Sequence, residues 1–407
     1  MATVQRTTPL VFALLCIAIS VPSVSGRSAR QASPTELTVH EWGTFTSVAG
    51  RSGHAVRWEP LEGSTDLPDF VEHLRSADTK AGLQGTVRME TPVLYFYAPA
   101  ETTVSVSVSF ARGLITEWYP HADRVKPDPK NDLMPDALFD HNYNGSIAWN
   151  SVKISPGLAA NFPHDEIETH YYAARETASA PVIVNTRSGT QQEKFLFYRG
   201  VSVTPVPVAA QSESDGKLIV KNLGQDTIPA TILFERRGNR MGYRLGGALQ
   251  GEVTIDPPEL NGTMESLSRD LESVLTTQGL YPDEARAMIA TWQSSWFEEG
   301  TRLLYIVPAR FVNGILPLTI NPAPSQMVRV FVGRLELITP ATERAVETAL
   351  ANRDRTGITK YGRFLLPILE QIKRENPDRS AEIDKELMET YDVPVAEVPA
   401  KQVPRHD

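Results

Sequence analysis

The first long stretch of the chain, residues 37–256, alternates between apolar and polar positions with a period of two. In TTVSVSVSF, for example, Val104, Val106 and Val108 fall on one face of a strand and the intervening serines fall on the other. Such segments are separated by Gly, Pro, Asn and Asp, which is typical of strands joined by turns. No helical period intervenes, so we expect an antiparallel β-sandwich or jelly-roll-like body rather than parallel β-α-β units.

The period changes at about residue 257. Apolar residues recur at helical spacing in MESLSRDLESVLTTQG and in YPDEARAMIATWQSSW, which predicts two helices. Two strands follow, in TRLLYIVP and MVRVFVGRLELI. Thr339 and Pro340 then have the residue types of an N-cap and a first helical position, and further helices are predicted over 363–375 and 380–391.

The N-terminus has the three parts of a secretory signal peptide. Arg6 precedes the apolar run PLVFALLCIAISV, and small residues stand at positions 24 and 26, so we expect cleavage after Gly26. A lipoprotein signal would use Cys16, but that residue lies inside the apolar run with Leu15 before it. Cleavage would remove Cys16, the only cysteine. A signal peptide also implies export, so we expect the mature chain in the periplasm or outside the cell.

Together these patterns predict an α+β protein. An antiparallel β-sandwich/jelly-roll-like body is followed by a smaller mixed α/β region. The predicted divisions, in order, are a signal peptide (1–26), a linker (27–36), the β-sandwich-like domain (37–256), the mixed α/β region (257–391) and a disordered tail (392–407).

Charge and hydropathy narrow the class of partner. The formal net charge is −9 at pH 7 and no stripe of Lys and Arg is present, which argues against nucleic acid and anionic lipid. No apolar run after the signal peptide reaches about 18 residues, so we expect no transmembrane segment in the mature chain. The expected partner is an extracytoplasmic ligand or an envelope component.

The segment LTVHEWGTFTSV contains His40-Glu41, the first half of the zinc-protease motif His-Glu-x-x-His. Its many β-branched residues favour a strand, and position 44, where the motif needs its second histidine, holds a threonine. In a strand His40 and Glu41 point to opposite faces, so they cannot form half of that site. We therefore reject the zinc-protease interpretation.

Three charged residues nevertheless fall on otherwise apolar strand faces: Glu41, Glu90 and Arg199. A bulge at Gly43 or near Pro92 would change these assignments, because it resets the period of two. Since buried charges persist when they are paired, one interpretation is a structural Glu–Arg pair. The other is a polar pocket in which Glu41 or Glu90 acts as a catalytic acid or base and Arg199 orients an anionic group.

A calcium site is one candidate in the loop-rich stretch between residues 117 and 170. In DHNYNG, the residues Asp140, Asn142 and Asn144 match the start of a calcium loop, whose oxygen ligands alternate before a glycine. The twelfth position is Ser151, where the helix-loop-helix form of the site needs a glutamate. Asn-Gly is also a common hairpin turn, so a calcium site and a plain turn are both considered.

A zinc site is the second candidate in this stretch. In HDEIETHYY, His164 and Glu168 would share a helical face, whereas Glu168 and His170 would share a strand face. Either geometry leaves a histidine beside a carboxylate, which suits zinc or a general base. His121 is a further candidate ligand, and a solvated polar surface is the alternative.

The chain lacks a nucleophile elbow, a phosphate loop and a dinucleotide fingerprint. In the absence of a complete catalytic constellation, we do not assign the chain as an enzyme or a non-enzyme, and the sequence favours a binding or envelope-associated interaction protein. The alternative is a metal-assisted hydrolase of an extracytoplasmic polymer, with zinc or calcium as cofactor.

Five segments carry a resemblance over about residues 37–340: HEWGTFTSVAG, METPVLYFY, EKFLFYRGV, WFEEGTRLLYIVP and MVRVFVGRLELITP. Together they resemble an uncharacterised family of exported bacterial proteins. The resemblance implies an extracytoplasmic location, and it carries over no activity and no site residues.

Overall fold

The computed structural model describes residues 36–61, 67–74, 83–126, 143–166 and 169–391. The predicted signal peptide (1–26) and tail (392–407) lie outside these residues. The described fold is α+β, with several antiparallel sheets and a group of helices toward the C-terminus, which confirms the predicted fold class. None of the helices in the described ranges is long and apolar enough to cross a membrane.

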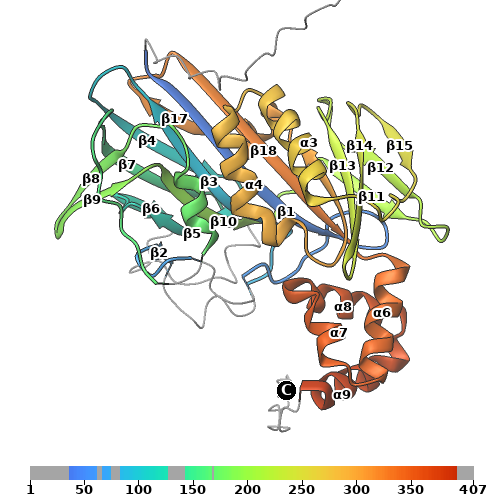
Figure 1. The fold of residues 1–407 in the computed structure, drawn as a ribbon. Coiled ribbons are helices and arrows are strands. Elements are labelled where there is room, and N and C mark those ends of the chain that lie inside the picture. Colours follow the sequence, from blue (N-terminus) through green and yellow to red (C-terminus); the bar gives the residue numbers. More distant parts are fainter. Residues whose placement is uncertain (1–35, 62–66, 75–82, 127–142, 167–168, 392–407) are drawn as a thin grey trace, which may run out of the picture. The chain divides into compact units, whose positions relative to one another are not determined.

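The largest sheet of the described residues has nine strands (Figure 1). In spatial order they are β14 (Arg240–Gly246), β13 (Thr231–Arg237), β16 (Gly300–Ile306), β18 (Gln326–Leu337), β1 (Thr38–Ala49), β3 (Val87–Tyr97), β10 (Leu196–Ser202), β5 (Gly113–Tyr119) and β2 (Glu72–His73).

Two smaller sheets complete the described β structure. One contains, in order, β11 (Val208–Ser212), β12 (Leu218–Asn222) and β15 (Glu252–Ile255). The other contains β17 (Leu318–Asn321), β4 (Thr102–Phe110), β7 (Gly145–Ile154), β8 (Val182–Thr186) and β9 (Gly189–Glu193), with β6 (Arg124–Lys126) paired to β7.

Within the described ranges, the helices fall into three places along the chain. A 3-10 helix, η1 (His170–Arg175), precedes β8. The α3 (Met264–Thr277), α4 (Pro282–Trp296) and α5 (Ala309–Ile315) helices lie between the later strands. The C-terminal group comprises α6 (Pro340–Ala351), α7 (Arg355–Thr359), η2 (Gly362–Phe364), α8 (Leu365–Glu375), η3 (Pro377–Arg379) and α9 (Ser380–Tyr391).

Strand β1 lies at the centre of the large sheet. It pairs antiparallel with β3 and, along its whole length, parallel with β18. In this sheet β16 and β18 stand between β13 and β1. Strands that precede residue 256 in the sequence and strands that follow it therefore belong to one sheet. The parallel pair is the part of this topology that the alternation pattern did not predict.

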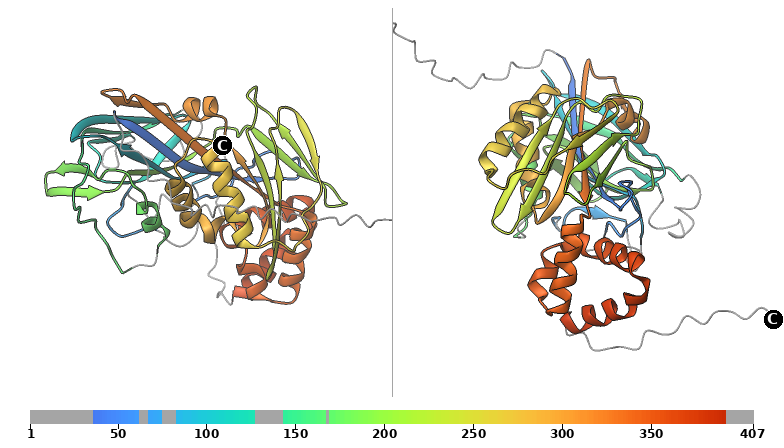
Figure 2. Two further views of the ribbon diagram at one scale, coloured as in Figure 1. Left: turned by 45° about the horizontal axis from the view of Figure 1, so that its top comes forward. Right: turned by 90° about the vertical axis from the view of Figure 1, so that its right-hand side faces the viewer.

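The two faces of the large sheet are covered by different elements. The α3 and α4 helices lie side by side on one face (Figures 1 and 2), where Trp42, Leu271 and Trp292 share a core cluster. The opposite face packs on β4 and β7, in a cluster that includes Phe45 and Trp149. The C-terminal helices have a third cluster of their own, which includes Val48 of β1 and Trp58.

Local sequence explains most of these elements. Val104, Val106 and Val108 of β4 are at most 1% exposed, as the alternation predicted. The α3 helix buries Leu267, Leu271 and Leu275, and its N-cap Thr263 accepts a hydrogen bond from the Ser266 N–H. Thr339 caps α6 in the same way, since its hydroxyl oxygen accepts from the Thr342 N–H at 3.2 Å.

Candidate functional site

Strand β1 places His40 and Glu41 on opposite faces of the sheet, as the sequence predicted for a strand. Glu41 is fully buried on the face of Phe45, and its carboxylate accepts hydrogen bonds from the Tyr198 hydroxyl and from Arg329 Nε. Burial lowers the pKa of Arg329, but the adjacent Glu41 carboxylate outweighs this effect, so the net shift of the pKa is upward. Both carboxylate oxygens of Glu41 are thus engaged by neighbouring side chains.

Glu90 does not lie on the apolar strand face to which the sequence assigned it. That assignment assumed an unbroken period of two along the strand. The β1–β3 register passes from Trp42↔Val93 to Thr44↔Glu90, so Thr91 and Pro92 form a bulge, and Thr91 has a φ of 49°. The bulge shifts Glu90 away from the face of Leu94 and Phe96. Glu90 therefore points to the side of the sheet where α4 and the C-terminal helices pack.

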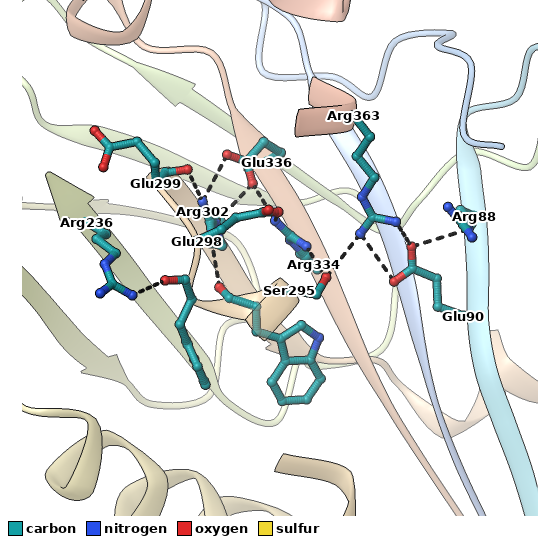
Figure 3. Close-up of polar contacts among 12 residues, drawn as sticks. Arg88, Glu90, Arg236, Ser295, Glu298, Glu299, Arg302, Arg334, Glu336 and Arg363 are labelled. Atoms are coloured by element: carbon teal, nitrogen blue, oxygen red, sulfur yellow. Dashed lines mark hydrogen bonds and ion pairs between the residues drawn. The ribbon is translucent and has the colours of Figure 1, made fainter. Parts of the chain in front are cut away.

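A buried ion-pair network surrounds Glu90 (Figure 3). The Arg363 guanidinium donates to Glu90 and also reaches Ser295 Oγ at 3.3 Å, and Arg88 Nε lies 3.5 Å from Glu90. Burial raises the pKa of Glu90, but Arg363, Arg88 and Arg199 outweigh it, so the pKa is lowered from its ordinary value. Glu90 is held as a carboxylate by arginines.

The same network continues across β18 and β16 (Figure 3). Arg334 is fully buried and donates to Glu298 at 2.7 Å and to Glu336 at 3.2 Å. Arg302, also fully buried, lies 3.0 Å from Glu336, and burial lowers its pKa to about 10 against the opposing effect of Glu336. These contacts cross-link neighbouring strands beneath α4.

Arg199 belongs to this side of the sheet, whereas Glu41 does not. The Arg199 guanidinium lies 5.6 Å from the centre of the Phe197 ring and 6.0 Å from the centre of the Trp292 ring. It also donates a hydrogen bond to Thr91 Oγ1 at 3.4 Å. The three charges predicted to share one pocket therefore separate. Glu90 and Arg199 lie on one face, and Glu41 lies on the other.

The candidate metal ligands that the structure describes have separate partners. His121 Nδ1 lies 2.7 Å from Glu72 Oε1, and His170 Nε2 lies 2.7 Å from Ser294 Oγ. The His164 ring packs against Tyr172 with 4.5 Å between ring centres. Asn144 uses its side-chain oxygen to accept from the Arg112 N–H at 2.9 Å.

Asp140, Asn142 and Glu168 lie outside the described residues. Within the ranges that the structure describes, no group of three or more His, Cys, Asp and Glu side chains is arranged to hold a metal ion. Zinc and calcium therefore gain no support from the described residues.

A polar cluster that the sequence did not predict connects β1 to α4. His40 Nδ1 lies 2.8 Å from Glu284 Oε2, and both side chains are at most 1% exposed. Glu284 also accepts from the Tyr97 hydroxyl and from the Tyr281 backbone N–H, each at 2.8 Å. The helical spacing in YPDEARAMIATWQSSW predicted α4, whose first turn holds Glu284, but no local pattern indicated that His40 would contact that residue.

The described surface also contains a groove between two sheet edges. Strand β14 ends the nine-stranded sheet and β15 ends the three-stranded sheet. A hollow of about 740 Å³ lies between them. It is lined by Thr231, Tyr243, Arg244, Leu245, Gly246, Gly247, Ala248, Leu249, Val253, Thr254, Ile255, Asp256, Glu259, Asn261, Gly262 and Ser266.

The β15 side of this groove presents backbone hydrogen-bonding groups. The Asn222 N–H donates to the Gly251 carbonyl at 2.8 Å, so by the period of two Val253 and Ile255 are also bonded to β12. The N–H and C=O groups of Glu252 and Thr254 then point away from β12. In the described part of the chain they have no backbone partner.

The β14 side is partly covered. The Gly262 N–H donates to the Met241 carbonyl at 2.9 Å, and Arg244 Nε donates to the Pro257 carbonyl at 3.1 Å. Residues 257–262 thus follow the outer edge of β14. A Cβ added at Gly242 would lie 2.0 Å from the Glu259 carbonyl oxygen, so glycine is required for this close approach.

Apolar side chains are exposed beside the open edge. Leu245 is 52% exposed and Val253 is 40% exposed, and both line the hollow. A Cβ added at Gly247 or Gly251 would meet nothing within 4 Å, so the connection between the two strands leaves open space. The groove combines a free strand edge with apolar surface.

Comparisons with known proteins give no family. No family model matches the chain, and no curated protein sequence matches it. A structure of the Fcho1 mu homology domain from Danio rerio with a bound Eps15 peptide is 8% identical, with a TM-score of 0.29 over 74% of this chain and 96% of that chain. The yeast delta-COP-I mu-homology domain complexed with a Dsl1 WxWxV peptide is 8% identical, with a TM-score of 0.24 over 74% and 97%. Likenesses this weak establish neither a shared fold nor a function.

Proposed function

We propose that the protein binds an extended segment of a partner protein, which adds as a strand to β15 in the groove between β14 and β15. The observation that carries this proposal is the open edge of β15, where the backbone groups of Glu252 and Thr254 face a hollow of about 740 Å³. An added strand would satisfy these groups, and the groove would take its side chains.

The energetics favour this site over the buried charges. An edge strand with unpaired N–H and C=O groups is a template for another strand, and native proteins normally cover or blunt such edges. Here residues 257–262 cover the edge of β14, while β15 remains accessible. Burial of Leu245 and Val253, which are 52% and 40% exposed, would add an apolar contribution to binding.

The ion pairs of Glu41 and Glu90 support a binding protein over the alternative hydrolase. A catalytic acid or base must reach its substrate, whereas Glu41 is engaged by Tyr198 and Arg329, and Glu90 by Arg363. Their arrangement suits a structural role. The binding function therefore does not depend on any of these charged residues.

The proposed site of action is outside the cytoplasm. The apolar run near the N-terminus and the small residues Val24 and Gly26 support export to the periplasm or secretion. The partner would then be an extracytoplasmic protein or an envelope component. Detection of the cleaved chain in the extracytoplasmic fraction would test this part of the proposal.

The strand-addition proposal can be tested with two variants at one position. Thr254→Pro removes the outward N–H while sparing the bonds of Val253 and Ile255 to β12, and proline is tolerated on an edge strand. Thr254→Ala keeps the N–H and serves as the matched control. The probe is a short synthetic peptide selected from a random display library on the whole chain.

We expect the selected peptide to bind the wild type and T254A equally, and T254P roughly ten-fold more weakly or less. Fluorescence anisotropy would measure the affinities, and equal melting temperatures would confirm that all three chains are folded. Equal binding by T254P would contradict strand addition at β15. Failure of the library to yield any binder would contradict the proposal as well.

A further inference from the structure

Two acidic side chains stand at one end of the groove. Asp256 directly follows β15, and Glu259 belongs to the segment that covers the edge of β14. Both residues are exposed, and neither forms an ion pair with any residue that the structure describes. One oxygen of Glu259 accepts from Asn261 Nδ2 at 3.0 Å, which leaves its other oxygen directed to no described side chain.

The groove therefore carries an excess of negative charge. Among its described lining residues Arg244 is the one cation, and its Nε is already bonded to the Pro257 carbonyl. Lys217 lies outside the lining, within electrostatic reach of Asp256, but it is paired with Asp215 at 3.2 Å. The nearby Glu252 is paired with Lys221 at 2.8 Å, so that pair adds no net charge. The lining also includes the apolar side chains of Val253, Leu245 and Ile255, beside neutral polar side chains such as those of Thr254 and Ser266.

We infer that the groove selects an extended segment in which apolar side chains are followed by a Lys or Arg, an inference that rests on the strand-addition function proposed above. The backbone of the added strand supplies sequence-independent affinity, whereas side chains that enter the groove supply specificity. Apolar side chains would contact Val253 and Ile255, and the cation would reach Asp256 and Glu259 beyond the end of β15.

The same charges argue against a second copy of this chain as the occupant. Antiparallel pairing of two β15 strands centred on Thr254 would place Glu252 of one copy opposite Asp256 of the other. Directly opposed like charges destabilise a strand pair. The Lys221 that pairs with Glu252 is 52% exposed, so this solvent-screened pair offsets only part of the repulsion. The groove therefore disfavours pairing with itself while it accepts a segment of opposite charge.

The composition of selected peptides tests this inference even while the natural partner is unidentified. The same random peptide library is selected on the wild type, on the double variant Asp256→Asn/Glu259→Gln, and on Glu265→Gln. Glu265 lies outside the groove lining on α3 and is 88% exposed, so its variant controls for the loss of an exposed carboxylate elsewhere on the surface. We expect Lys and Arg to be enriched on the wild type and on E265Q, and this enrichment to disappear on the double variant.

A matched peptide pair then gives the size of the effect. For one selected peptide and its Lys→Gln version, calorimetry at low salt should show the lysine form binding the wild type about three-fold to ten-fold more tightly. High salt or the double variant should remove this difference, because exposed charges are screened.

Two outcomes separate failure of the inference from failure of the proposed function. If peptides bind and T254P weakens them, but the lysine and glutamine forms bind the wild type equally, charge selection is wrong and strand addition stands. If T254P has no effect, or no peptide is selected, the proposed function fails and the inference fails with it.

Discussion

The central strand β1 and the edge strand β15 treat polar groups in opposite ways. All twelve residues of β1 are buried, and its polar side chains His40 and Glu41 each meet a partner from a distant part of the chain. In β15 three of the four residues are exposed, and the outward backbone groups have no backbone partner among the described residues. Strand β1 thus buries its polar side chains inside the nine-stranded sheet, although the hydroxyls of Thr44, Thr46 and Ser47 have no hydrogen-bond partner among the described residues. Strand β15, at the edge of the three-stranded sheet, leaves its outward backbone groups open to solvent.

This difference has an energetic basis. Charges are removed from water at a cost of several kcal/mol per ion unless they are paired, so a central strand can carry Glu41 because Arg329 and Tyr198 accompany it. A strand edge in contact with water incurs no such cost and can exchange water for a partner. The charges that fall on apolar strand faces therefore have a structural role here, whereas the proposed binding depends on backbone groups, which every sequence possesses.

The largest effect should follow from breaking the central ion pair. Arg329→Met leaves Glu41 buried without its cation, so we expect a loss of about 3–5 kcal/mol in the free energy of unfolding, measured with urea. The control Arg286→Met breaks a pair with Glu272 of similar length, 2.8 Å, in which the arginine is 60% exposed, and should change stability far less.

The double variant Glu41→Leu/Arg329→Met sharpens this test. Removal of both charges should restore much of the lost stability, because no buried ion is left unpaired. A double variant that is less stable than R329M alone would show that the pair contributes more than charge neutralisation.

A smaller effect is expected at the His40–Glu284 contact. His40→Leu removes a buried hydrogen bond of 2.8 Å and should cost about 1–3 kcal/mol in thermal unfolding. His121→Leu is a matched control, since His121 lies 2.7 Å from Glu72 but is 50% exposed, and it should cost below about 1 kcal/mol. Equal losses in the two variants would remove burial as the explanation.

The smallest effect on stability is expected in the groove. Leu245→Asn changes a side chain that is 52% exposed and should alter the free energy of unfolding by no more than about 0.5 kcal/mol. The same variant should weaken binding of the selected peptide, because it removes apolar contact area. If L245N loses stability but keeps its affinity for the peptide, Leu245 has a structural role and takes no part in binding, which would contradict this prediction.

The sequence predicted the local elements well because local patterns determine them. The alternation in TTVSVSVSF gave β4, the spacing of Leu267, Leu271 and Leu275 gave one face of α3, and Thr339 gave the start of α6. The burial of Glu41 on the face of Phe45 was also predictable, since no bulge intervenes between them on that strand. These features depend on a few neighbouring residues.

Non-local features could not be predicted in this way. The bulge at Thr91 and Pro92 turns Glu90 to the other face, and its exact place depends on the fit of β3 against Gly43. The partner of His40 comes from residue 284, and the arginine that pairs with Glu90 from residue 363. The groove arises where the edges of two sheets lie side by side, and this arrangement cannot be predicted from the sequence of a single segment.

The parallel pairing of β1 with β18 has a consequence for the order in which the molecule can fold. The contact between Glu41 and Arg329 joins residues 288 positions apart, and the full register requires the chain through Leu337. Contacts of such long range close slowly, because loop-closure entropy must be overcome first. Until that late strand is available, β1 has one uncovered edge, so a fragment that ends before residue 326 should keep this sheet incomplete and expose an aggregation-prone edge in its middle.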